Sequence, residues 1–146
     1  MTSHTFTIPG EPISVNHAYR TFNLNGKTRR ALSTEGQRFK SAVTLLTRRE
    51  RIPTPTARFR LALHFHGNWD TQEGKPRKKD LSNLVKLLED GICAGLGVDD
   101  CWVRGLTLDA THTTAPAYTV VTITPLDETV HDVLTRCSDG YAGRKA

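Results

Sequence analysis

The stretch that most restricts the fold runs from residue 58 to residue 66, where large apolar side chains alternate with polar or small ones. The large apolar side chains are Phe59, Leu61, Leu63 and Phe65. A period of two is typical of a strand that buries one face, because successive side chains point to opposite sides of a sheet. We therefore expect a sheet with one face covered by other elements.

Shorter signals predict the remaining strands. Runs at 4–8, 103–108 and 118–124 favour strands, since they alternate or are rich in Val, Thr and Ile. Asn25-Gly26 lies between short runs at 22–24 and 30–32, and this dipeptide is typical of a tight hairpin. Residues 13–20 show no period and are predicted to form a loop.

Two main helices are predicted. The first runs from Thr34 to Arg51, with Thr34 and Gln37 as a capping box and Pro53 just beyond its end. The second runs from 81 to 94, with Gly95 and Gly97 as terminators. Its apolar residues fall within an arc of about 100°, and they are Leu81, Leu84, Val85, Leu88 and Ile92. Its polar side presents Ser82, Asn83, Lys86, Glu89 and Asp90.

These elements predict one α+β domain over residues 1–126, with a mixed β-sheet covered by the two helices on one side. Residues 127–136 have the pattern of a short last helix, and 137–146 that of a flexible tail. No repeat or linker divides the chain, and 146 residues are enough for a single domain.

Charge and cysteine content narrow the class of function. The formal net charge is +5 and the pI is about 9.4, which favours a polyanionic partner, nucleic acid first. A basic domain with scattered charge is the alternative that the charge leaves open. The three cysteines form no CxxC pair, which argues against zinc and predicts a reducing, cytoplasmic location. We expect no signal peptide and no membrane partner.

The most informative window places acids in a basic setting. Asp80 follows the cluster Lys75, Arg77, Lys78 and Lys79, and Asp99-Asp100 comes after the predicted helix. Phosphodiester cleavage uses such a mixture, because Mg²⁺ prefers carboxylate oxygens and cations hold the backbone phosphates. Each part has an ordinary alternative: Asp80 as a helix cap, Asp99-Asp100 as a turn, and the basic run as a surface loop.

A family resemblance adds to this interpretation. The segment 80–86 (DLSNLVK), followed by Asp90 and by 97–100 (GVDD), resembles the RusA family of Holliday junction resolvases, whose helix start reads D-L-D-N-L-x-K. The opening IPGEP at 8–12 with Asn16 and Tyr19-Arg20, and STEG at 33–36, are similar to that family too. The resemblance runs from about Phe6 to Pro125.

The resemblance implies a dimeric, metal-dependent junction endonuclease. On that basis Asp80 and Asp100 match catalytic, metal-binding carboxylates, Asp99 matches a neighbouring acid, and Lys86 matches the functional lysine. Asn83 matches a family residue whose role the resemblance does not fix.

The sequence departs from the family motif at one position that is expected to bind the metal. Ser82 stands where the family has a second acid, and a hydroxyl is a weak ligand. Asp90 lies roughly 15 Å of helix from Asp80, so it cannot readily take the place of that acid within one chain. Asp99 is the acid that we expect to compensate.

The length of the predicted second helix separately favours a dimer, because it keeps Asp80 and Asp100 of one chain apart. A helix of about fourteen residues spans roughly 20 Å, with Asp80 at its start and Asp100 beyond its end. The two acids share a metal only if the chain doubles back, or if two helices pack antiparallel in a two-fold homodimer. In the dimer, Asp80 of one chain meets Asp99 and Asp100 of the other.

The sequence thus predicts a Mg²⁺-dependent endonuclease of four-way and other branched DNA, with Mn²⁺ as a possible substitute. The residues expected to contact DNA are Lys75, Arg77, Lys78, Lys79, Arg29, Arg30 and Asn83. A non-catalytic DNA-binding protein on the same scaffold stays open because of Ser82. A basic interaction domain in which Asp80 is only a cap is the third interpretation.

Overall fold

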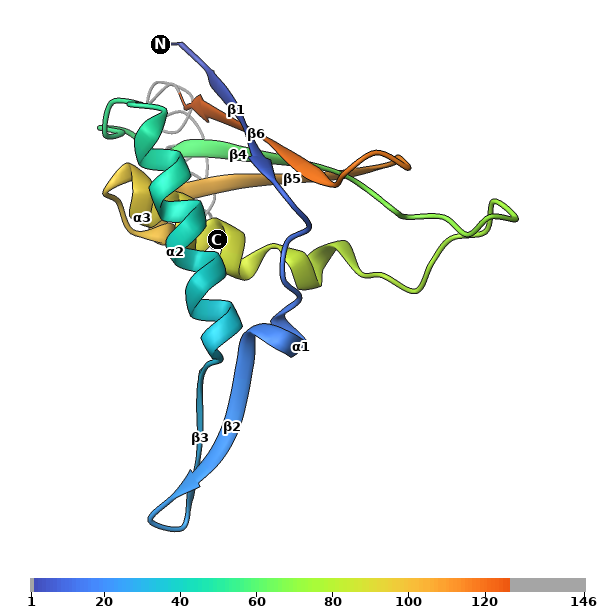
Figure 1. Cartoon of the computed structure of the whole chain (residues 1–146). Coiled ribbons are helices and arrows are strands. Elements are labelled where there is room, and N and C mark those ends of the chain that lie inside the picture. Colours follow the sequence, from blue (N-terminus) through green and yellow to red (C-terminus); the bar gives the residue numbers. More distant parts are fainter. Residues whose placement is uncertain (1, 127–146) are drawn as a thin grey trace, which may run out of the picture.

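The fold is a mixed four-stranded sheet with two main helices on one side and a two-stranded hairpin that projects from the domain (Figure 1). The structure is a computed structural model that describes residues 2–126. Its elements in chain order are β1 (His4–Pro9), α1 (Val15–Ala18), β2 (Tyr19–Leu24), β3 (Lys27–Leu32), α2 (Thr34–Arg49), β4 (Phe59–Gly67), the 3-10 helix η1 (Leu81–Leu84), α3 (Lys86–Leu96), the 3-10 helix η2 (Asp100–Trp102), β5 (Val103–His112) and β6 (Tyr118–Pro125). The predicted α+β class, with a mixed sheet and two main helices, is confirmed.

Strand β4 is the centre of the sheet, whose order is β1-β6-β4-β5. It pairs antiparallel with β6 and parallel with β5, so that Leu63 lies opposite Val121 on one side and Leu108 on the other. The predicted alternation is confirmed, since Phe59, Leu61 and Leu63 are at most 1% exposed. A parallel neighbour requires a crossover, and η1 with α3 forms it.

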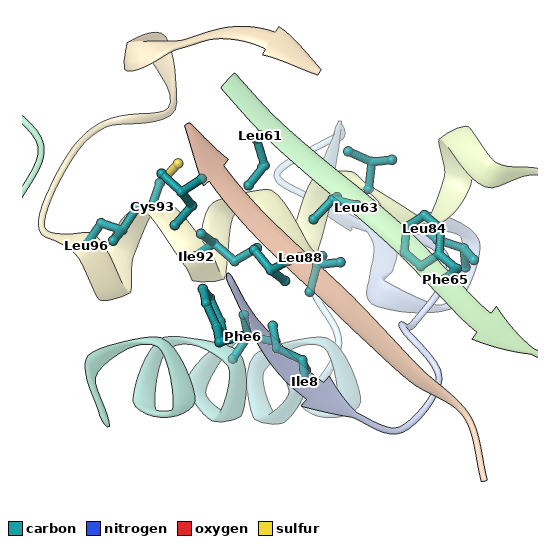
Figure 2. Close-up of a cluster of buried hydrophobic side chains, with 14 of the residues drawn as sticks. Phe6, Ile8, Leu61, Leu63, Phe65, Leu84, Leu88, Ile92, Cys93 and Leu96 are labelled. Atoms are coloured by element: carbon teal, nitrogen blue, oxygen red, sulfur yellow. The ribbon is translucent and has the colours of Figure 1, made fainter. Parts of the chain in front are cut away.

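Helix α3 covers the apolar face of the sheet. Leu88 and Ile92 are fully buried and belong to one hydrophobic cluster with Leu61 and Leu63 (Figure 2). Burying an aliphatic side chain of this size contributes about 1.5–3 kcal/mol, so these residues anchor the crossover on the sheet. Gly97 ends α3 with a left-handed φ of 76°, as expected for a C-terminal glycine.

Helix α2 packs closely against α3 through two glycines. A Cβ atom on Gly91 would lie 2.7 Å from Val43 Cγ1, and one on Gly95 would lie 2.5 Å from Thr47 Cβ. Gly91 and Gly95 are four residues apart and so lie on one face of α3. Gly95, predicted only as a terminator, therefore lies inside the helix and allows this close approach.

The predicted second helix is wrong in its first turn. Residues 81–84 form η1, and α3 begins only at Lys86 and ends at Leu96. A 3-10 turn aligns residues three apart, so Leu81 and Leu84 both face the core cluster. Tertiary burial thus outweighs the regular α-helical pattern here.

The predicted start of the first helix at Thr34 is confirmed, but its predicted cap is wrong. The N-cap is Ser33, whose hydroxyl accepts a hydrogen bond of 3.0 Å from Gly36 N, so Thr34 and Gln37 form no capping box. The helix ends at Arg49 rather than Arg51, since Arg51 has a φ of 52°.

The N-terminal region is more ordered than predicted. The expected loop at 13–20 holds the short helix α1 and the start of β2. The hairpin at Asn25-Gly26 is confirmed, with φ values of 51° and 72°, but its strands are longer than predicted. The last helix predicted at 127–136 lies outside the described residues. Within 2–126, no helix has the length and apolar character to cross a membrane.

The helix contact at Gly91 gives a stability prediction. In an ordinary exposed helix, Gly→Ala stabilises by roughly 1 kcal/mol. Here Gly91→Ala should instead lower the free energy of unfolding by about 1–3 kcal/mol, because the methyl group overlaps Val43. Urea denaturation checks the sign, with the exposed α2 change Ser41→Ala as a control within about 0.5 kcal/mol. An increase in stability for Gly91→Ala would contradict the packing described.

Candidate active site

Asp80 follows the basic loop directly and occupies the N-cap position of η1. Its backbone is extended, and its side chain makes no capping hydrogen bond. Instead the carboxylate accepts a hydrogen bond of 3.3 Å from Asn83 Nδ2. The alternative interpretation of Asp80 as a helix cap is thus correct for the position of the residue but not for its carboxylate, which is exposed and makes no capping hydrogen bond.

Asp80 opens onto a cleft of about 850 Å³. Four segments far apart in the sequence line it: the loop after β1 with α1, the start of α2, the end of the basic loop, and η1. The lining residues that carry polar or charged side chains are Glu11, Ser14, Asn16, His17, Glu35, Arg38, Lys78, Lys79, Asp80 and Asn83. The fold thus brings the N-terminal motif with Asn16 to the same place as Asp80 and Asn83.

Asp80 also lines a second, more open hollow of about 510 Å³. Ser82 lines it together with Asp70 and with Leu108 and Ala110 of β5. Asp80 is therefore placed beside the second half of β5.

Asp100 lies at the opposite end of that strand. It is in η2, just before Val103 begins β5. From Val103 to Leu108 a strand advances roughly 16 Å at about 3.3 Å per residue. Asp80 and Asp100 of one chain are therefore well separated, as the length of the predicted helix suggested.

Lys86 joins Asp100 to helix α3. Its ammonium lies 2.9 Å from a carboxylate oxygen of Asp100 and 2.9 Å from one of Asp90. The hydrogen bond to Asp100, followed by that to Asp90, raises the pKa of Lys86 above its ordinary value. The same hydrogen bond from Lys86 lowers the pKa of Asp100. Both groups are thus charged at neutral pH, and Lys86 cannot act as a general base there.

Asp99 has a local structural role. One oxygen of its carboxylate accepts a hydrogen bond of 3.1 Å from Cys101 N and so caps η2. The alternative interpretation of Asp99-Asp100 as an ordinary turn therefore holds for Asp99. This residue is nevertheless exposed, and the hydrogen bond uses only one of its two carboxylate oxygens.

The acids do not assemble a complete metal site within one chain. Residues 2–126 contain no group of three His, Cys, Asp or Glu side chains placed to hold a metal ion. The exposed carboxylates are suitable oxygen donors for a hard divalent cation, but Asp80 lies apart from Asp99 and Asp100. The donor types fit such an ion, and within residues 2–126 these acids lie in two separate groups.

A comparison with protein-family models decides the family. The model of the endodeoxyribonuclease RusA matches residues 9–124. The chain belongs to the RusA family. No curated protein matched the chain. At the level of the family, this is the scaffold of a Holliday junction nuclease.

On this RusA scaffold, the basic side chains predicted to contact DNA differ in whether they already bind other protein groups. Lys75 and Lys78 are exposed, whereas Arg77 Nε donates to Asn68 Oδ1 at 3.2 Å and to the Asp70 carbonyl at 3.1 Å. Lys79 is partly buried and pairs with Glu11. The basic loop is therefore partly held by its own cations.

The hairpin carries the other predicted contacts. Arg29 and Arg30 are exposed on β3, and the Arg30 guanidinium lies 4.3 Å from the centre of the Tyr19 ring. The hairpin and the basic loop both extend away from the domain (Figure 1).

Glu11, His17, Glu35 and Arg38 were not singled out as site residues from the sequence, yet they line the cleft. Glu11 and Glu35 lie inside the two N-terminal motifs that resemble the family. That was the only available signal, and it gave no distance to Asp80.

The Lys86–Asp100 pair gives a pH prediction. The ¹³C carboxyl signal of Asp100 should titrate below the ordinary aspartate value of about 3.9, because Lys86 stabilises the charged form. Lys86→Met should raise the midpoint toward that value, and the exposed hairpin change Lys27→Met should leave it unchanged. The stabilisation from this pair is present above the ordinary pKa and is lost as the pH falls through the lowered one. An unchanged midpoint in Lys86→Met would exclude the ion pair.

Proposed function

We propose that the chain is a structure-specific endonuclease that resolves Holliday junctions in DNA recombination and repair by paired, symmetric phosphodiester cleavage. The observation that carries the proposal is the setting of Asp80. Its carboxylate makes no capping hydrogen bond and is exposed, and Asp80 lines one cleft together with Lys78 and Arg38 in a chain of the RusA family.

The acids are proposed to hold Mg²⁺, with Mn²⁺ as a substitute. Asp80, Asp99 and Asp100 would be its ligands. When bound, such an ion neutralises charge on the phosphate and promotes attack by water. Asp80 is held by Asn83, and Asp100 is held by Lys86, so each acid has a partner that fixes its orientation.

Lys86 is proposed to act as a fixed cation near the scissile phosphate. Its ammonium already lies between two carboxylates. It would therefore reach an incoming phosphate while it still orients Asp100. A positioned cation of this kind stabilises charge that develops in the transition state.

A two-fold homodimer is proposed to complete the site. Asp80 and Asp100 flank β5 at its two ends within one chain, so two chains packed antiparallel would bring each Asp80 to the partner subunit's acid pair. Such a dimer has two sites, and a four-way junction needs two symmetric cuts.

DNA binding is proposed to depend on backbone contacts and shape. Lys75, Lys78, Arg29 and Arg30 are exposed cations on the two projecting segments. Contacts with phosphates make binding strongly dependent on salt and carry little base specificity.

The first experiment tests cleavage of a labelled synthetic four-way junction with Mg²⁺, and again with EDTA. We expect paired symmetric nicks that require the metal. Asp80→Asn and Asp100→Asn should each lower the cleavage rate at least about 100-fold, as loss of a group that stabilises the transition state does. Junction binding that survives EDTA with no nicks under any divalent metal would instead support a non-catalytic binding protein.

Mixing the two variants tests the dimer. In a shared arrangement, a heterodimer of Asp80→Asn with Asp100→Asn keeps one site with both acids intact. It should nick one strand of the junction at a substantial fraction of the wild-type rate. If each chain held its own site, both sites would lack an acid and the mixture would stay inactive.

Ser82 gives a prediction of its own. Ser82→Asp adds a carboxylate two residues from Asp80 and should lower the Mg²⁺ concentration for half-maximal cleavage by about tenfold, a typical effect of one added hard ligand. Electron paramagnetic resonance of free Mn²⁺ measures the affinity without cleavage. Exposed Ser41→Asp controls for charge alone, and equal effects of the two changes would rule out a ligand role at position 82.

A further inference from the structure

Lys79 is held differently from its neighbour Lys78. Its ammonium pairs with the Glu11 carboxylate, donates to the Asn68 carbonyl at 3.3 Å, and lies 4.8 Å from the centre of the Trp69 ring. Lys78 is exposed and forms no salt bridge within residues 2–126. Two adjacent lysines of the same cleft thus have different surroundings.

These contacts join three segments that the sequence keeps apart. Glu11 lies in the loop after β1, whereas Asn68 and Trp69 directly follow β4. The backbone at Arg77 also donates to the Trp69 carbonyl at 2.8 Å. The end of the basic loop is therefore fastened both to the sheet and to the N-terminal loop.

Asp80 directly follows Lys79, the last residue that these contacts hold. The main chain at Lys79 is fixed by a hydrogen bond of 2.8 Å from its N–H to the Arg77 carbonyl. Glu11 and Lys79 both line the cleft onto which Asp80 opens. The contacts that hold the Lys79 side chain therefore lie one residue away from the Asp80 carboxylate, in the same cleft.

We propose that Lys79 and Glu11 are positioning residues: their ion pair closes one end of the cleft and sets the Asp80 carboxylate for cleavage. Lys79 is then not a phosphate contact, which revises the role predicted for it from the sequence. The inference rests on the proposed nuclease function. The side chains are 25% and 49% exposed, so the pair contributes little to stability and acts through geometry.

Glu11 makes the inference sharply testable. Removing an acid from a DNA-binding cleft should strengthen binding if only the net charge matters. If Glu11 positions Asp80, the same change should impair cleavage. Misplacement of a reacting group by about 1 Å can lower a rate by about 100-fold.

The experiment compares Glu11→Gln and Lys79→Met with the control Lys78→Met, which removes the same charge one residue away. Junction binding is measured against salt concentration without divalent metal, and the single-turnover cleavage rate is measured at saturating protein with Mg²⁺. Lys79→Arg is the conservative variant, and thermal melting confirms that all variants are folded.

We expect Glu11→Gln and Lys79→Met to cleave at least about tenfold more slowly than wild type, while the conservative variant Lys79→Arg stays within about threefold. Lys78→Met should lower the slope of log K against log salt by about one, as loss of a phosphate contact does. Lys79→Met should leave that slope unchanged. A slope lowered by about one in Lys79→Met, with normal cleavage in Glu11→Gln, would overturn the proposal.

A measurement without cleavage separates this inference from the nuclease proposal. The Asn83 side-chain amide donates to Asp80, so its NMR signals report where that carboxylate lies. Glu11→Gln and Lys79→Met should shift these signals alike, and Lys78→Met should not. If the wild-type protein cleaves no junction but these shifts occur, the nuclease proposal fails and the positioning contact stands. Unshifted signals in both variants overturn the positioning contact.

Discussion

The packing of α3 on β4 is the constraint on which the rest of the molecule depends. Leu88 and Ile92 share one core with Leu61 and Leu63, and the crossover that holds α3 there makes β5 run parallel to β4. A parallel crossover begins and ends at opposite ends of the strands that it joins. Asp80, before the crossover, and Asp100, after it, are separated for that reason. The fold itself thus favours a site completed by a second chain.

Much of this core could be predicted from the sequence, because side-chain period reports which face is buried. The alternation in β4 and the apolar arc of α3 are local patterns, and the structure has both. The errors lie where a distant contact decides. Ser33 caps α2 while its hydroxyl also donates to the His17 carbonyl, and residues 81–84 form a 3-10 turn because Leu81 and Leu84 both reach the core. Neither contact produces a periodic pattern in the sequence from which it could be predicted.

In the candidate site, too, local sequence features could be predicted, whereas contacts between distant segments could not. Asp80, Asn83, Lys86 and Asp100 lie in a 21-residue window of the chain (residues 80–100). The charges in this window and its resemblance to the RusA motif selected them as candidates. The pairing of Lys86 with Asp100 depends on η2 folding back toward α3, which no spacing rule gives. Glu11 lies much further from this window in the sequence, in the loop after β1, and the fold of the sheet brings it to Lys79. A basic cluster in a sequence therefore predicts the sign of the charge but does not tell which cations are already paired.

That distinction bears on how a small basic nuclease scaffold uses its charges. Among the described residues, Lys78 is exposed and unpaired and is proposed to contact DNA, whereas Lys79 is held by Glu11. Lys86 is held by Asp90 and Asp100 but stays half-exposed, which is compatible with its proposed place near the phosphate. Held cations lose part of their attraction for phosphate but fix the geometry of carboxylates that would otherwise rotate freely in water. Two acids at opposite ends of β5 each have a hydrogen-bond donor as partner, the neutral amide of Asn83 for Asp80 and the ammonium of Lys86 for Asp100. In the proposed dimer, each half of the site would be ordered before the halves meet, which would lower the entropic cost of assembling it on DNA.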